Sequence, residues 1–129
     1  MKSKYFTLAE LCSTNSGLTN MPDWEQVDNL YLLTEMVLDP LRALYGRAIK
    51  VNSGYRSVDV NKAIGGARTS QHLFGLAADI TGGDKVSNAQ LYNLIVAHLP
   101  FDQVINERDF AWVHVSVSNV KNRMEQLKL

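Results

Sequence analysis

The chain has 129 residues, a length typical of one domain that buries roughly two-thirds of the surface of its unfolded form. Apolar residues make up 46% of it, which provides for a core and argues against intrinsic disorder. The 13 basic and 13 acidic side chains cancel, and no apolar stretch approaches the roughly 18 residues of a membrane span. We therefore expect a single domain over residues 1–129 that binds no nucleic acid and inserts into no membrane.

The cysteine content and the first residues indicate a cellular setting. Cys12 is the single cysteine, so the chain cannot form an internal disulfide, which suits a reducing compartment. The opening segment M-K-S-K-Y-F-T-L-A-E-L lacks the apolar core of a secretory signal. We therefore expect a chain that is cytoplasmic on synthesis and reaches any substrate outside the membrane only after release. The sequence carries no indication of oligomeric state.

The first third of the chain is predicted to be helical. A short helix is expected over 7–13, and a polar loop follows it. Asp23 and Gln26 have the spacing of a capping box and open a long helix, on which apolar residues recur at intervals of three and four. Pro40 lies within this helix and is expected to kink or divide it, and Gly46 is expected to end it.

The remaining elements alternate between strands and helices. In order, they are a strand at 49–53, a brief helix capped by Ser57, a strand at 77–80, a helix opened by a Ser87–Gln90 capping box, strands at 102–107 and 112–117, and an amphipathic terminal helix within 119–129. The last two strands are predicted to form a hairpin, and no regular βαβ alternation is present. This pattern favours an α+β fold with a small antiparallel sheet packed against helices.

Three residues in two of these strands and the loop before them have the chemistry of a metal site. Residues 70–80 read S-Q-H-L-F-G-L-A-A-D-I, which places His72 and Asp79 seven positions apart, and His114 follows in W-V-H-V-S-V. His114 lies opposite an all-valine face of its strand, and Asp79 enters an apolar strand where a carboxylate needs a partner. Two imidazoles and one carboxylate suit a catalytic zinc with an open fourth position. The alternatives are ordinary histidines, or a non-haem iron site, which usually occupies a larger β scaffold.

These motifs also carry a resemblance to a known family. S-G-Y-R-S, S-Q-H-L-F-G-L-A-A-D-I and W-V-H-V-S are similar to the zinc D-alanyl-D-alanine carboxypeptidases and endopeptidases of peptidoglycan, which have a Hedgehog-like fold. The family pattern S-x-H-x-x-G-x-A-x-D, followed by W-x-H, is matched at Ser70, His72, Gly75, Ala77, Asp79 and His114. The resemblance implies zinc on His72, Asp79 and His114. It also implies that Arg56 binds a carboxylate of the peptidoglycan stem peptide and that Ser70 lines the same pocket.

The sequence departs from the family pattern at the general base. Many members carry an acid three residues before the last histidine, and this chain has Ala111 there. Glu107 and Asp109 are the nearest carboxylates. If Glu107 pairs with Trp112, it shares a sheet face with His114 on a diagonal of about 7–8 Å, whereas Asp109 lies in the turn. We therefore predict Glu107 as the catalytic base, with a solvated charge at a strand end as the alternative.

Three functions are consistent with these features. The first is a zinc metallopeptidase that hydrolyses an amide bond of the stem peptide, as a D,D-carboxypeptidase or an endopeptidase, in the setting of a phage or prophage lysis enzyme. The second is a non-catalytic zinc-containing binding module on the same scaffold, which the alanine at position 111 leaves open. The third is a metal-free structural domain of a larger particle.

Overall fold

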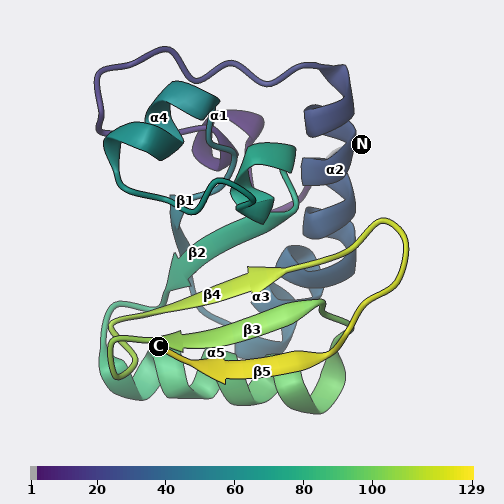
Figure 1. The fold of residues 1–129 in the computed structure, drawn as a ribbon. Coiled ribbons are helices and arrows are strands. Elements are labelled where there is room, and N and C mark those ends of the chain that lie inside the picture. Colours follow the sequence, from purple (N-terminus) through teal and green to yellow (C-terminus); the bar gives the residue numbers. More distant parts are fainter. Residues whose placement is uncertain (1–2) are drawn as a thin grey trace.

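The computed structural model describes residues 3–129 and has the predicted α+β architecture, with a five-stranded sheet packed against helices (Figure 1). The strands are β1 (Lys50–Ser53), β2 (Ala77–Thr81), β3 (Gln103–Glu107), β4 (Trp112–Ser116) and β5 (Glu125–Lys128). They lie in the order β1-β2-β4-β3-β5. The pairs β1–β2, β2–β4 and β3–β4 are antiparallel, and β3–β5 is parallel. The sheet is therefore mostly antiparallel, as expected.

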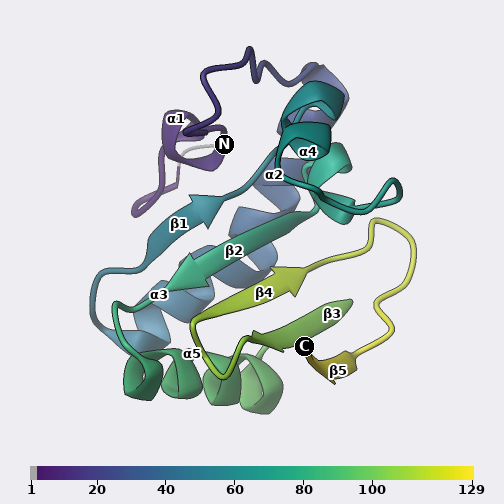
Figure 2. The same ribbon diagram turned by 60° about the vertical axis from the view of Figure 1, so that its left-hand side comes forward.

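The two faces of β4 divide the molecule into a core side and an open side. Val113 and Val115 are fully buried and belong to the hydrophobic core, as the alternation in the sequence predicts. The helices α2 (Trp24–Leu33), α3 (Asp39–Tyr45) and α5 (Lys85–His98) lie behind the sheet in Figure 2. His114 and Asp79 are directly opposite each other in the β2–β4 pair and share the other face. The sheet thus presents Asp79 and His114 away from the large helices.

The N-terminal helices start where the capping signals predict. Thr7 caps α1 (Leu8–Leu11), and Asp23 and Gln26 form the predicted capping box of α2. A π-helical turn, η1 (Thr34–Leu38), separates α2 from α3, so the long helix is divided just before Pro40. Proline lacks the N–H of a regular helical turn and its ring crowds the preceding turn, which the wider π turn accommodates. Gly46 ends α3 in the left-handed conformation, as expected.

Two predictions about the second half of the chain are wrong. The helix α5 begins at Lys85 rather than after Ser87, because the carboxylate of Asp84 accepts a hydrogen bond from the Ser87 N–H and caps the helix. The chain end is not a helix: residues 125–128 form β5, which pairs with the exposed edge of β3. Pairing of this edge satisfies backbone groups that a solvated terminal helix would leave open. Within residues 3–129, no helix has the length and apolar character needed to cross a bilayer.

Candidate metal centre

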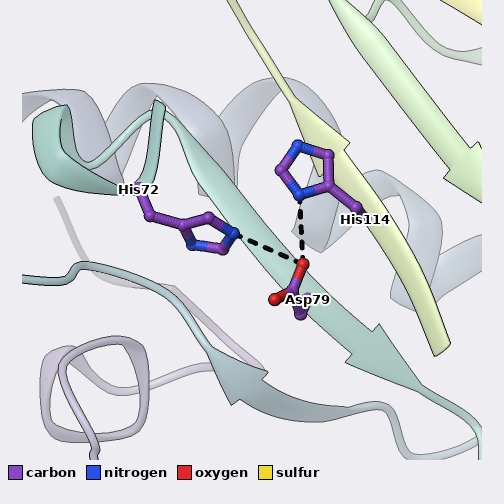
Figure 3. A group of neighbouring side chains, drawn as sticks. All are labelled: His72, Asp79 and His114. Atoms are coloured by element: carbon purple, nitrogen blue, oxygen red, sulfur yellow. Dashed lines mark hydrogen bonds and ion pairs between the residues drawn. The ribbon is translucent and has the colours of Figure 1, made fainter. Parts of the chain in front are cut away.

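The three predicted metal ligands come from three elements and converge on the open face of the sheet (Figure 3). His72 belongs to the 3-10 helix η2 (Gln71–Phe74), Asp79 to β2 and His114 to β4. The Oδ1 atom of Asp79 lies 3.0 Å from Nδ1 of His114 and 3.3 Å from Nε2 of His72. Potential ligand atoms of the three residues all lie within 4.8 Å of one another. Residues 42 positions apart in the sequence thus present donor atoms to one point.

The orientation of His72 is set by a backbone carbonyl. Its Nδ1 lies 2.7 Å from the carbonyl oxygen of Gly54. A carbonyl only accepts hydrogen bonds, so Nδ1 carries the proton and donates it, which leaves Nε2 with a free lone pair. Gly54 itself must be glycine, since a Cβ at this position would lie 2.2 Å from the carbonyl oxygen of Leu11. The glycine of S-G-Y-R-S therefore brings the histidine-orienting carbonyl into place.

The Nε2 atom of His72, which faces Asp79, has no hydrogen-bond partner. Every other buried side-chain nitrogen or oxygen within residues 3–129 has one. Burial lowers the pKa of His72, which keeps the imidazole neutral despite the opposing effect of Asp79. A lone pair on Nε2 and an ionised carboxylate oxygen 3.3 Å away repel each other unless a cation lies against both.

Zinc fits this donor set in chemistry and in spacing. Ligands of a tetrahedral zinc at about 2.0–2.1 Å lie about 3.3–3.4 Å from one another, close to the 3.0 and 3.3 Å observed around Asp79. Neutral imidazole nitrogens and a carboxylate oxygen are the ligands that catalytic zinc sites use with three protein residues. Among the described residues, these three alone form a cluster of histidine, cysteine and acidic side chains with metal-ligand spacing.

Asp79 is held by a cation on its second oxygen. The Nη2 of Arg56 donates to Oδ2 of Asp79 over 2.9 Å, and both side chains are only 12% exposed. Burial by itself raises the pKa of Asp79, but the hydrogen bond with His114 is the largest of the contacts that outweigh it and hold that pKa well below its ordinary value. The carboxylate is therefore ionised with Oδ1 turned to the two imidazoles, as a metal ligand requires.

The segment that carries His72 is shaped by two small structural devices. The hydroxyl of Ser70 accepts a hydrogen bond from the His72 N–H and caps η2. Gly75 ends η2 with a φ of 74°, and a Cβ there would lie 2.5 Å from the carbonyl oxygen of Gln26 in α2. The glycine of the motif thus lets the loop turn and lie against the helix before the chain enters β2.

All six residues predicted for the site line one pocket of about 620 Å³: Arg56, Ser70, His72, Asp79, Glu107 and His114. Glu107 is opposite Trp112 and Ile105 is opposite His114, so the predicted diagonal between Glu107 and His114 is confirmed. Burial and the negative charge of Asp79 raise the pKa of Glu107 above its usual value. Asp109 is not among the lining residues, and its 73%-exposed carboxylate pairs with Lys85.

Further residues line the same pocket. Gln71, Gln103 and Trp112 lie on the segments already assigned to the site. Arg123 comes from the C-terminal segment, which was predicted as a solvated helix. Its partner is the buried Asp102, whose position directly before β3 offered no pattern to single it out. An acidic residue buried at a strand start is visible only once the strands are assembled.

Comparison with known families agrees with the fold and the ligand geometry. Residues 4–116 match the model of the family "Peptidase M15", and the chain belongs to this family. A segment of 55 residues is 42% identical to the "Zinc D-Ala-D-Ala carboxypeptidase" of Streptomyces albus G. The similar segment covers 42% of this chain and 22% of that relative. The chain is thus similar to about a fifth of the length of the curated relative.

Proposed function

We propose that the chain is a zinc-dependent metallopeptidase that hydrolyses an amide bond in the stem peptide of peptidoglycan. Membership of the peptidase family and the similarity to the zinc D-Ala-D-Ala carboxypeptidase of Streptomyces albus G support this proposal. The observation that carries it is the buried, unpartnered Nε2 of His72 facing the ionised carboxylate of Asp79 beside His114. A structural cluster would satisfy this nitrogen with a donor, whereas a metal site leaves it bare.

His72, Asp79 and His114 would hold the zinc through Nε2, Oδ1 and Nδ1. When bound, zinc supplies a Lewis acid that polarises a carbonyl group and lowers the pKa of a coordinated water to about 7. The chain contributes the rigidity of the ligand set: the Gly54 carbonyl fixes one imidazole, and Arg56 fixes the carboxylate.

Glu107 would move the proton in the reaction. Its carboxylate would accept a proton from the attacking water and deliver it to the leaving amine. A Glu whose pKa is raised is a better proton acceptor and donor near neutral pH than a solvated one. Its register on β3, diagonal to His114, puts a long side chain within reach of the centre of the pocket.

Arg56 and Ser70 would bind the peptide. Arg56 uses Nε for Ser53, Nη1 for Asn61 and Nη2 for Asp79. A guanidinium has five N–H groups, so two remain for a substrate carboxylate. Arg56 then links the substrate to the same carboxylate that holds the metal, which couples binding to the position of the reacting bond.

Digestion of purified murein tests the proposal. The zinc-loaded chain is expected to release new amino termini, with muropeptides identified by mass spectrometry to define the bond. Removal of the metal with a chelator and the substitution Glu107→Gln should each abolish the release, whereas Asp109→Asn should leave it unchanged. Full activity of Glu107→Gln would remove Glu107 from the mechanism. Inactivity of the zinc-loaded wild type on every stem-peptide bond would favour the non-catalytic zinc-binding module.

The biological setting remains a prediction. We propose that the chain acts on the cell wall after release from the cytoplasm, as a phage or prophage lysis enzyme does. Expression in the cytoplasm of a bacterium should then be harmless, and lysis should follow only when a pore-forming protein is co-expressed. Lysis without a pore would contradict this setting and leave the peptidase proposal unaffected.

A further inference from the structure

A buried carboxylate anchors an arginine at one end of the pocket. Asp102 is 4% exposed in its side chain and accepts hydrogen bonds from the backbone N–H, Nε and Nη2 of Arg123 over 2.7 to 3.2 Å. The Nε2 of Gln71 donates to the same carboxylate over 2.9 Å. Because Gln71 precedes His72 in η2, the C-terminal segment and the metal-ligand loop are fixed to the same buried acid.

The anchored arginine remains available to a ligand. Its side chain is 56% exposed and lines the pocket, while Asp102 is nearly inaccessible. The pocket therefore meets the guanidinium rather than the carboxylate that holds it. No hydrogen bond within residues 3–129 engages Nη1 of Arg123, so one edge of the planar fork keeps its donors. Because the contact with Asp102 already holds the side chain of Arg123, binding a ligand with its other edge costs little further side-chain entropy.

The register of the sheet places this arginine opposite the proposed base. Glu107 pairs with Trp112 at one end of the β3–β4 pair, and Gln103 pairs with Ser116 at the other. The centre of the pair carries His114, two residues or roughly 7 Å from each end. Asp102 directly precedes Gln103, so its arginine partner lies at the Gln103 end. The pocket thus has an acidic end and a basic end on either side of the metal ligands.

We propose that Arg123 is a specificity-determining residue that binds a carboxylate of the peptide substrate at the end of the pocket remote from Glu107. The inference rests on the proposed peptidase function and adds a second anionic subsite to the one proposed at Arg56. Arg123 lies outside residues 4–116, which match the family model, so the subsite belongs to this chain's own C-terminal segment. The substrate class is a peptide with a free carboxylate near the cleaved bond, in preference to its amidated form.

Matched peptides separate this role from general binding. Each peptide is prepared in an acid form and a carboxamide form, one pair differing at a side-chain carboxylate and the other at the terminal carboxylate. The wild type is expected to favour the acid form in both pairs, one through Arg56 and the other through Arg123, with a preference of about fivefold in KM at Arg123, the upper range for an exposed ion pair. Arg123→Gln should remove the acid preference in one pair only, with kcat unchanged for the carboxamide, and Arg123→Lys should keep part of that preference. Arg47→Gln, a surface arginine bonded to Gln90, should retain it fully.

Two further measurements keep the inference testable. If Arg123→Gln is unfolded because Asp102 loses its partner, the double substitution Asp102→Asn and Arg123→Gln removes both charges and serves in its place. If the wild type cleaves neither form, the proposed function fails, and the dissociation constants of the acid and carboxamide peptides are compared by calorimetry instead. An equal rise in KM for the acid and carboxamide forms in Arg123→Gln would overturn the proposed subsite at Arg123. So would an acid preference that stays undiminished in both peptide pairs.

Discussion

Replacing Gly75 by alanine tests how the metal-ligand loop is held against the long helix. A Cβ at position 75 would lie 2.5 Å from the carbonyl oxygen of Gln26, and the backbone φ is 74°. The substitution therefore combines left-handed strain with overlap against a backbone atom that cannot rotate away. Gly46 provides the matched control, because its φ is 75° and a Cβ there has nothing within 4 Å.

The two variants differ by the overlap alone. Left-handed strain costs about 1–2 kcal/mol for a non-glycine residue, and overpacking adds about 1–3 kcal/mol. For 129 residues the unfolding entropy is about 0.27 kcal/mol/K, so 1 kcal/mol lowers Tm by about 4 °C. We expect Gly46→Ala to lower Tm by about 4–7 °C and Gly75→Ala by about 7–18 °C.

Thermal unfolding followed by circular dichroism measures both shifts, and a zinc titration shows whether the loop has moved. Only Gly75→Ala should also weaken zinc binding, because the displaced loop carries His72. Equal Tm losses in the two variants, with equal zinc affinity, would refute the argument that contact with α2 positions the ligand loop.

Three further predictions concern stability. The folded-state pKa of Asp102 is lowered from 3.8 to about 2, chiefly by the side chain of Arg123. The ionised carboxylate therefore contributes about 2 kcal/mol to the free energy of unfolding above pH 4, and this contribution is lost as the pH falls through 2. Acid titration of the free energy of unfolding should show this loss in the wild type and not in Asp102→Asn. Asn88→Ala should cost about 2–4 kcal/mol in urea unfolding, since the buried Asn88 side chain donates to the carbonyls of Phe110 and Ala111 and accepts from the Thr81 hydroxyl and the Gly82 N–H, and a cost below 1 kcal/mol would contradict this. Zinc at a hundredfold excess over its Kd should raise Tm by about 10 °C, and no rise would argue against a preformed site.

The sequence predicted the parts of the fold that depend on local patterns. Alternation in 112–117 identified the buried valine face and the opposite face of His114, because a strand sends successive side chains to opposite sides. The pairing of Glu107 with Trp112 followed from the hairpin alone, and the structure confirms it. The capping box at Asp23 was equally local. Such features need no knowledge of the rest of the chain.

Features that depend on assembled neighbours were missed. The residues 125–128 have no strong strand pattern, and they form β5 because β3 offers an unpaired edge. The same tertiary pairing brings Arg123 to Asp102, so the basic end of the pocket was invisible in the sequence. Arg56 was assigned to the substrate by resemblance, and its contact with Asp79 emerged only from the structure.

A crystal structure of the zinc-soaked chain, with anomalous data collected at the zinc edge, tests the central claim most directly. One anomalous peak is expected in contact with Nε2 of His72, Oδ1 of Asp79 and Nδ1 of His114, with no fourth protein ligand. A peak elsewhere, or a fourth side chain closing the coordination, would contradict a catalytic zinc held by these three residues.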